Sequence, residues 1–490
     1  MHDVRRPRVE LLSARQVELI LDEAFRTLAE LGILVENKEA LDLFAAAGAR
    51  IGDHRKRAFL PQDVCESCIA SVPRQFTLYG RDGEDAFQVG GEGVHFNPGS
   101  AATLVYDFAD KRIRKPVTGD VIQFVRITEA LAAMDAQSTG IVPVDIPQEV
   151  ADRYRLFLAL VYGRKPVITG TFARGAFASM HEMLVAVRGS SAAVVEKPLA
   201  VFDCCPTSPL AWSDLTGQTL IDCARSGVPA QLIPAPLLGA TSPVTLSGTL
   251  VQHTAENLSG IVLHQTAASG APLVYGAAAT VMDMRNGSAS MSAVEAVMVD
   301  AGSVQIGRSL GLPVHSYMGL SDAKLPDMQA GFETTMGTVM AALAGVNIAS
   351  GAGMLNFVNC QSLEKLVMDA EICSHAQRLL DGIGIRGELA GFDVIEECVA
   401  SGAFLTSEHT RRHFRQEIYY PTPVVDRASQ REWEAAGAPT AGDRAHEAVA
   451  KMLDSQEPVL PPGEIVAALE SLMRRDAAAA GADTLPARGV

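Results

Sequence analysis

The sequence predicts an α/β protein built on a TIM (β/α)₈ barrel, with an N-terminal helical lead-in and a C-terminal extension. Eight short apolar or β-branched runs lie between residues 93 and 385. Each run is followed by a polar turn rich in Gly or Pro and then by an amphipathic stretch of helical length, the pattern of parallel βα units. Eight such units over 93–385 fit a closed barrel, which typically needs ~250 residues. A doubly wound sheet is the alternative, although it usually has fewer strands and often a phosphate loop.

Residues 1–92 form the predicted N-terminal helical region. Apolar side chains within 13–31 recur at the spacing of an amphipathic helix, and Ser13 stands where an N-cap is expected. A second helix is expected over 37–47, followed by short turns at Pro61, Pro73 and Gly80.

Residues 93–385 carry the eight predicted βα units. The expected strands are 94–97, 134–142, 166–172, 198–204, 229–233, 272–278, 313–318 and 347–351. The expected helices are 118–132, 150–162, 174–188, 213–226, 247–268, 291–310, 328–345 and 362–381.

Residues 386–490 lose this alternation and form the predicted C-terminal extension. They contain a basic, aromatic stretch at 409–421, prolines at 458, 461 and 462, and a last helix. We expect the extension to clasp the barrel or a neighbouring subunit. Its aromatic residues Tyr419, Tyr420 and Trp433 beside the basic cluster favour a homo-oligomer.

The composition excludes several classes of function. Forty-one basic and fifty-seven acidic residues give a net charge of −16, and the pI is near 5.2. Such a chain repels phosphate backbones, so no nucleic acid is expected as partner. No apolar run approaches the ~18 residues of a membrane-spanning helix, and the N-terminus lacks the apolar core of a signal peptide. We therefore expect a cytoplasmic protein that does not bind membranes.

No metal site is expected. Cys65 and Cys68 have no second ligand pair at a finger-like distance. His409 and His413 have the i, i+4 spacing of some zinc enzymes, but Arg411 and Arg412 stand where the catalytic Glu would be. The motifs of serine hydrolases, phosphate-loop NTPases and nicotinamide enzymes do not occur in the sequence.

Candidate functional residues are sought at the carboxyl ends of the predicted strands, because barrel enzymes place their active sites there. The residues that follow the apolar runs form a polar and aromatic set: Phe96, Asn97, Asp145, Thr171, Phe172, Asp203, Tyr275, Tyr317 and the loop 321–324. Each also has a structural interpretation, such as Phe172 in the core or Asp203 as a turn residue.

Several long strings in the sequence resemble the trimethylamine:corrinoid methyltransferase family. They are CPTSPL (205–210), GATSPVTLSGTLVQ (239–252), MDMRNG (282–287), SDAKLPDMQAGFE (321–333), ALAGVNIASGAGML (342–355), SLEKLVMDAEI (362–372) and HTRRHFRQE (409–417). The resemblance extends over nearly the whole chain. One departure is ASGAFL at 400–405, where the family more often has a Gly-rich string.

The resemblance implies a TIM barrel that passes a methyl group from an amine to cob(I)alamin held on a separate small corrinoid protein. Archaeal trimethylamine enzymes of the family contain pyrrolysine, whereas this sequence shows only the twenty common residues. It is therefore similar to the pyrrolysine-free members, which act on glycine betaine and related quaternary amines. The implied donor is a quaternary ammonium compound, with no pyrrolysine and no metal in the chain itself.

A methylated cation needs aromatic faces and negative charge around it. We expect Tyr317 and Asp322 to be the central catalytic pair. Substrate-binding candidates are Phe96, Phe172 and Tyr275 for the cation, and Asn97, Lys324 and Gln329 for a donor carboxylate. Alternatively, Asp322 caps the helix that follows it.

Three other functions stay open. One is methyl transfer from a donor of the trimethylamine type. Another is a protein that binds quaternary amines without turnover or that handles the corrinoid. A metal-dependent barrel hydrolase would need histidines at strand ends, where only His95 and His315 occur.

Overall fold

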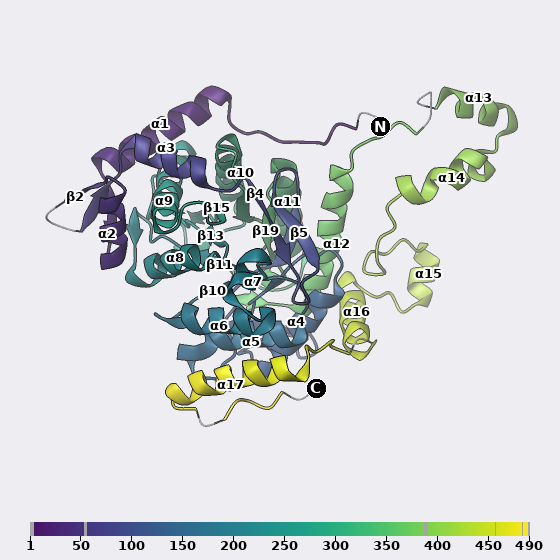
Figure 1. Ribbon diagram of the computed structural model, residues 1–490. Helices are drawn as coiled ribbons and strands as arrows, with labels where there is room; N and C mark the ends of the chain where they lie inside the picture. Colours follow the sequence, from purple (N-terminus) through teal and green to yellow (C-terminus); the bar gives the residue numbers. More distant parts are fainter. Residues whose placement is uncertain (1–3, 53–55, 387–390, 456, 483, 489–490) are drawn as a thin grey trace.

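The computed structural model describes residues 4–52, 56–386, 391–455, 457–482 and 484–488. Its centre is an eight-stranded parallel barrel surrounded by helices (Figure 1). The barrel strands are β6 (His95–Pro98), β9 (Gln137–Ser138), β10 (Val167–Gly170), β11 (Ala200–Cys204), β13 (Ala230–Leu232), β15 (Leu273–Ala277), β18 (Val314–Tyr317) and β19 (Ile348–Ala352). Each falls within or beside one of the eight predicted runs, so the prediction of a TIM barrel is confirmed.

The strands follow one another around the barrel in chain order, and β19 then pairs with β6. The gap between the first two strands is bridged by Asp135, which precedes β9. Its N–H donates to the Phe96 carbonyl (2.8 Å), and its carboxylate accepts from the Phe96 N–H (3.0 Å). These two hydrogen bonds close the barrel between β6 and β9.

Helices cover the outside of the barrel and return the chain to the start of the next strand. They are α4 (Thr118–Ala130), α5 (Ala151–Tyr162), α6 (Ala176–Arg188), α7 (Ser191–Glu196), α8 (Asp214–Ser226), α9 (Leu246–Ala267), α10 (Val294–Ser309), α11 (Met328–Ala344) and α12 (Leu363–Leu380). A short 3₁₀ helix, η1 (Gln148–Val150), precedes α5.

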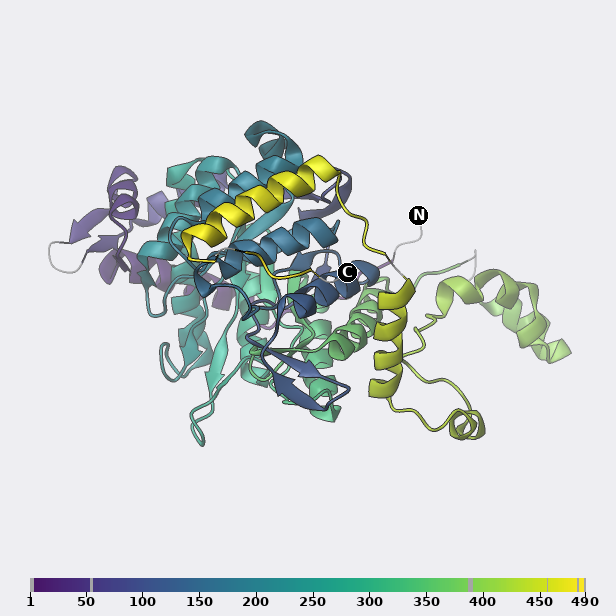
Figure 2. The same ribbon diagram turned by 90° about the horizontal axis from the view of Figure 1, so that it is seen from below.

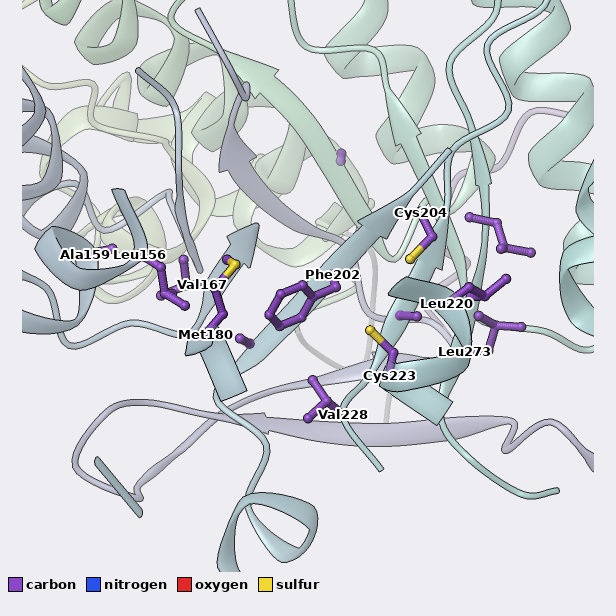
Figure 3. Close-up of a cluster of buried hydrophobic side chains, with 14 of the residues drawn as sticks. Leu156, Ala159, Val167, Met180, Phe202, Cys204, Leu220, Cys223, Val228 and Leu273 are labelled. Carbon is purple, nitrogen blue, oxygen red and sulfur yellow. The ribbon is translucent and has the colours of Figure 1, made fainter. Parts of the chain in front are cut away.

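The alternation of side chains along a strand decides which residues face the helices and which face the barrel interior. Figure 3 shows this on β11, where Phe202 points between Met180 of α6 and Cys223 of α8. Asp203 lies between Phe202 and Cys204 in the sequence, and its side chain therefore points to the opposite face, into the barrel.

The N-terminal region is not wholly helical, which corrects the prediction for residues 1–92. It contains α1 (Ala14–Glu30), α2 (Lys38–Ala46) and α3 (Gln62–Ser71), and also the strands β1 (Ile33–Val35), β2 (Arg50–Gly52), β3 (Arg57–Phe59), β4 (Gln75–Tyr79) and β5 (Asp85–Gly90). The first three strands form a sheet with β12 (Ala211–Trp212), which follows β11 of the barrel. A three-residue strand carries too few alternating positions to be recognised in a sequence.

The hairpin β4–β5 closes one end of the barrel. Its side chains Leu78, Phe87 and Val89 form one buried cluster with residues from five barrel strands or their starts: Ala136, Ile168, Val201, Val274 and Ile348. These residues lie at or near the amino ends of the strands. The hairpin is thus a plug, and only the opposite end, where the strands finish, remains for a site.

Several short strands decorate that opposite end, here called the mouth. They are β7 (Leu104–Asp107), β8 (Arg112–Arg114), β14 (Leu237–Leu238), β16 (Thr280–Met282), β17 (Ala289–Ser290), β20 (Met354–Leu355) and β21 (Cys360–Gln361). They form two small sheets, one from β14, β16 and β17 and one from β20, β21, β7 and β8.

The C-terminal extension divides into a packed part and a projecting part. The helices α16 (Ala441–Ser455) and α17 (Gly463–Ala479) lie against the barrel helices, with α17 across α5 and α6 (Figures 1 and 2). The helices α13 (Phe392–Ser401), α14 (Glu408–Glu417) and α15 (Gln430–Ala435), with the 3₁₀ turn η2 (Phe404–Thr406), stand away from the body in both views. None of the described helices is long and apolar enough to cross a membrane.

Candidate active site

A polar layer crosses the barrel interior above the plug. His315, Ser350 and Asn97 come from the three neighbouring strands β18, β19 and β6. The Ser350 hydroxyl donates to Asn97 Oδ1 (2.9 Å) and lies 3.0 Å from His315 Nε2. Burial lowers the pKa of His315 to about 3. The imidazole is therefore neutral and donates from Nε2 to the hydroxyl.

Asp203 stands above this layer, at the end of β11. Its Oδ2 accepts from the Tyr317 hydroxyl (3.3 Å), and its Oδ1 accepts from Gln231 Nε2. Burial raises the pKa of Asp203 to about 7, although both hydrogen bonds and the charge of Arg155 act in the opposite direction. The carboxyl group can therefore change charge near neutral pH.

Arg155 brings a positive charge to the same end of the barrel. It lies on α5, is 1% exposed, and donates from Nη1 to the Thr139 carbonyl. Its guanidinium lies 4.3 Å from the centre of the Phe172 ring. Burial lowers the pKa of Arg155 to about 10, while Asp152, Tyr317 and Asp203 raise it. Its Nε has no hydrogen-bond partner among the described residues.

Apolar side chains surround Tyr317 at the mouth. Tyr317 forms a buried cluster with Ala102, Ile233, Ala278, Leu320 and Met354. Two partly buried side chains from the decorating loops, Met291 and Val358, pack on this cluster. The mouth therefore combines an aromatic and aliphatic wall with one acidic and one basic side chain.

Asp322 holds one of these loops in place. Its Oδ2 accepts from the hydroxyls of Ser290 and Ser292, the latter at 2.7 Å, on either side of Met291. Its Oδ1 is buried without a hydrogen-bond partner among the described residues. Asp322 does not cap α11, because Asp327 is the residue that accepts from the first backbone N–H groups of that helix. Asp322 is thus an anchor for the segment that carries Met291.

The structure brings three of the other predicted site residues to the barrel interior or its rim. Tyr317 and Asn97 point into the barrel, as the hydrogen bonds above show, and Phe172 is 44% exposed at the rim beside Arg155.

Phe96 and Tyr275 are not brought to the mouth. Both side chains occupy the alternate strand positions and lie in the main core between strands and helices. The Tyr275 hydroxyl donates to Thr254 of α9 (3.3 Å), on the outside of the barrel. A strand-end position alone does not distinguish these two faces of a strand.

Lys324 and Gln329 lie on the outer surface. Lys324 Nζ donates to the Asp322 carbonyl (2.8 Å) and lies 3.8 Å from the centre of the Phe357 ring. Gln329 donates to Glu333 on the first turns of α11 (2.9 Å). Their side chains are engaged with their own loop and helix.

Arg155, Asp203 and Gln231 belong to the pocket but are not among the predicted site residues. Asp203 was recognised only as one of several strand-end residues. Gln231 is a single polar residue inside the apolar string AQLIP, and that feature is the signal that could have identified it, because an isolated polar residue in a buried element needs a partner. Arg155 follows the polar residues Asp152 and Arg153, so the sequence gives no comparable signal for it.

Among the described residues, no three His, Cys, Asp or Glu side chains gather where they could share a metal ion. Cys65 and Cys68 lie on α3, and burial raises the pKa of Cys65 to about 12.

The chain is similar in sequence to methyltransferases from bacteria and archaea. It is 33% identical to trimethylamine methyltransferase MttB of Desulfitobacterium hafniense (strain DSM 10664 / DCB-2) over 442 residues, 90% of this chain and 89% of the relative. It is 31% identical to glycine betaine methyltransferase of Desulfitobacterium hafniense (strain Y51) over 469 residues, 95% and 97% of the two chains. It is 29% identical to trimethylamine methyltransferase MttB of Methanosarcina thermophila over 463 residues, 92% and 94% of the two chains.

The fold has a counterpart among solved structures. The crystal structure of the hydroxylamine MtmB complex aligns with a TM-score of 0.50 at 12% identity, covering 91% of this chain and 93% of that one. This similarity concerns the fold alone.

The family model for trimethylamine methyltransferase (MTTB) matches residues 2–481, which include the barrel, its plug and most of the C-terminal extension. Together with the relatives above, this match shows that the chain belongs to the trimethylamine methyltransferase (MTTB) family and is a methyltransferase.

Proposed function

We propose that this enzyme takes a methyl group from a quaternary ammonium donor that also carries a carboxylate, glycine betaine or a similar betaine. The methyl acceptor in this proposal is the cob(I)alamin of a separate small corrinoid protein. The observation that carries the proposal is the pair of opposite charges at the mouth. Asp203 and Arg155 influence each other's pKa, yet no ion pair within 4.0 Å joins them in the described part of the chain.

The charge distribution suits a zwitterion. A trimethylammonium group would lie against the Tyr317 ring with the ionised Asp203 beside it, since aromatic faces attract such cations by ~0.5–2 kcal/mol each. The carboxylate of the donor would lie toward Arg155, whose Nε–H has no acceptor among the described residues. A guanidinium is suited to carboxylates because its donors form a planar fork.

Methyl transfer from a quaternary nitrogen needs no acid catalyst in this chain. The demethylated product leaves with a neutral tertiary amine, so no side chain has to deliver a proton. The cobalt of the acceptor supplies the nucleophile when the corrinoid protein is bound. The residues of this chain hold the donor, orient one methyl group outward and exclude water, which is catalysis by positioning.

The mouth is the end of the barrel that fits an acceptor brought by another protein. The plug closes the opposite end. At the mouth, Cys205 and Phe172 follow their strands in exposed positions. No residue of this chain is assigned to the corrinoid itself.

The proposal is tested with donors that share a methylated nitrogen and differ in the rest of the molecule. The enzyme is incubated with cob(I)alamin and glycine betaine, proline betaine, carnitine, choline or trimethylamine, and the change from Co(I) to methyl-Co(III) absorbance is followed. We expect transfer from one of the carboxylate-bearing donors and little from choline. Binding of a betaine without any transfer, with the corrinoid protein present, would make the chain a binding protein.

Arg155→Met tests whether Arg155 binds the carboxylate of the donor. Loss of the guanidinium should raise the KM for the carboxylate-bearing donor by about 10- to 100-fold, the effect of one lost charge-assisted contact. The weak reaction with choline should stay the same. Equal losses for both donors would show that Arg155 maintains the barrel and does not select the donor.

Trimethylamine is the second candidate donor, because one of the relatives is named a trimethylamine methyltransferase at 33% identity. Trimethylamine carries no carboxylate, so Arg155 would have no role in binding it. Transfer from trimethylamine that Arg155→Met leaves unchanged would favour this candidate.

A further inference from the structure

Two apolar surfaces of the chain lack a partner in the structure. The first belongs to residues 391–418, here called the arm, which contain α13, η2 and α14 and stand away from the body in both views (Figures 1 and 2). Its exposed apolar side chains are Phe392 (67%), Ile395 (54%), Val399 (70%), Phe404 (47%) and Leu405 (87%). On α13, three of them recur at i, i+3 and i+7, along one face of the helix.

The base of the arm is firmly attached to α12. Arg378 donates to the Glu417 carbonyl (3.0 Å), and Arg386 pairs with the Glu417 carboxylate. Just beyond the arm, the hydroxyls of Tyr419 (2.7 Å) and Thr422 (2.6 Å) donate to Glu371, which is 4% exposed. These contacts fix the end of the arm to α12.

The second surface is a groove along the outer face of α11. It has a volume of about 1340 Å³ and is bordered by Tyr106, by Phe108 and by the start of α16, where Gly442 lies beside the Phe108 ring. Exposed apolar side chains run along its floor: Leu325 (47%), Met328 (85%), Phe332 (59%) and Met336 (45%). Such a contiguous patch is typical of a contact surface.

We propose that the arm of one copy lies in the α11 groove of a second copy, so that two chains exchange arms. The same chain carries both surfaces, and one symmetric contact would cover both surfaces of both copies.

The area supports a stable dimer. The nine side chains named above together expose on the order of 800 Å² per copy, if a large apolar side chain offers roughly 150 Å². Stable interfaces bury about 800 Å² from each partner.

The mass of the protein in solution tests the proposal. Light scattering after gel filtration should give a multiple of the 51.9 kDa chain mass at micromolar concentration. The arm variant Phe392→Ser/Val399→Ser and the groove variant Met328→Ser/Phe332→Ser should both shift the mass toward the single chain. Leu19→Ser is the matched control, because Leu19 is 56% exposed on α1, away from both surfaces. A monomeric wild type, or a dimer that both variants leave intact, would overturn the proposal.

Cross-linking identifies the surfaces that meet. Two differently tagged copies are expressed separately, and only the copy with a photoreactive residue at position 399 is grown in ¹⁵N medium. The two copies are then mixed under dissociating conditions and allowed to reassociate. We expect cross-links from the labelled arm to unlabelled peptides of 325–343. Cross-links confined to one chain, or to a different surface of the second chain, would show that arms are not exchanged into this groove. Circular dichroism confirms that each variant is folded.

Discussion

Asp203 is the residue on which the charge at the mouth depends. Burial raises its pKa to about 7, so the empty site holds a mixture of neutral and ionised carboxyl groups at neutral pH. A cationic donor attracts only the ionised form, and its binding lowers that pKa. Below the pKa the ionised fraction falls about tenfold for each pH unit.

Donor binding should therefore strengthen as the pH rises from 5 to 7 and become constant above 8. Calorimetric titration of the wild type with the donor over this range measures the effect. Asp203→Asn should bind the donor about 10- to 100-fold more weakly at pH 8, since it lacks the charge. Its affinity should be nearly independent of pH, and a variant that kept the wild-type pH profile would exclude Asp203 as the titrating group.

Asp322 acts through the segment that it anchors. The carboxylate accepts hydrogen bonds from Ser290 and Ser292 and so holds Met291 against the Tyr317 cluster. Asp322→Ala should lower the free energy of unfolding by about 1–3 kcal/mol, because two hydroxyls lose a charged acceptor. The loop 283–293 should also be cut faster in limited proteolysis.

Asp327→Ala provides the control for Asp322→Ala. Asp327 caps α11 only a few residues away, and its loss should cost about 1 kcal/mol of stability. This control should leave the rate of cleavage at 283–293 unchanged. Equal cleavage rates in the two variants would contradict the anchoring role of Asp322.

At the scale of elements, the hairpin β4–β5 contributes to the stability of the barrel but not to donor binding. Leu78 is fully buried in the plug, at the opposite end of the barrel from the mouth. Leu78→Ala should lower the free energy of unfolding by about 2–5 kcal/mol, the usual cost of emptying a buried leucine site. Donor affinity below the unfolding temperature should stay at the wild-type value, because the plug does not contact the mouth residues.

Denaturant titration and donor binding measure the two quantities for Leu78→Ala. Leu19→Ala is a suitable comparison, since this exposed leucine should cost little stability. Weaker donor binding in a fully folded Leu78→Ala sample would mean that the plug transmits strain to the mouth.

The barrel was predictable at this scale because its units repeat. Each apolar run followed by a helical pattern is a separate observation, and eight of them agree with one closed sheet. The short strands β1 to β3 were missed because three residues cannot establish a period of two. The hairpin β4–β5 does alternate in FTLY and AFQV, but turn residues at 80–83 obscured it.

For the whole molecule, buried carboxyl groups set the response of stability to pH. Asp300 of α10 accepts from the Ala279 N–H (2.8 Å) and the Ser316 hydroxyl (3.0 Å), and burial raises its pKa to about 7. The native state thus retains a proton that the unfolded chain loses near pH 4. Stability should fall as the pH rises from 4 to 7, by up to about 4 kcal/mol from this group.

Asp300→Asn should remove this part of the decline. The amide oxygen can still accept from the Ala279 N–H, and the amide NH₂ can donate to the Ser316 hydroxyl in place of the hydrogen bond that the carboxyl accepts from it. Denaturant unfolding at pH 5, 6, 7 and 8 measures the slope for both proteins. An equal slope in the variant and the wild type would assign the pH dependence to other groups.

The sequence by itself determined the kind of architecture, the ends of the strands where function is found, and the resemblance to a methyltransferase family. These depend on local periodicity and on strings of neighbouring residues. It also placed Tyr317 and Asn97 at strand ends, together with Phe96 and Tyr275. Only the tertiary structure decided that Phe96 and Tyr275 face the helices, that Asp322 anchors a loop, and that Arg155 and Gln231 belong with Asp203. The physical reason is that a strand's inward face is fixed by closure of the whole barrel, and that Arg155 of α5 comes near Asp203 of β11 only when segments far apart in the sequence have packed together.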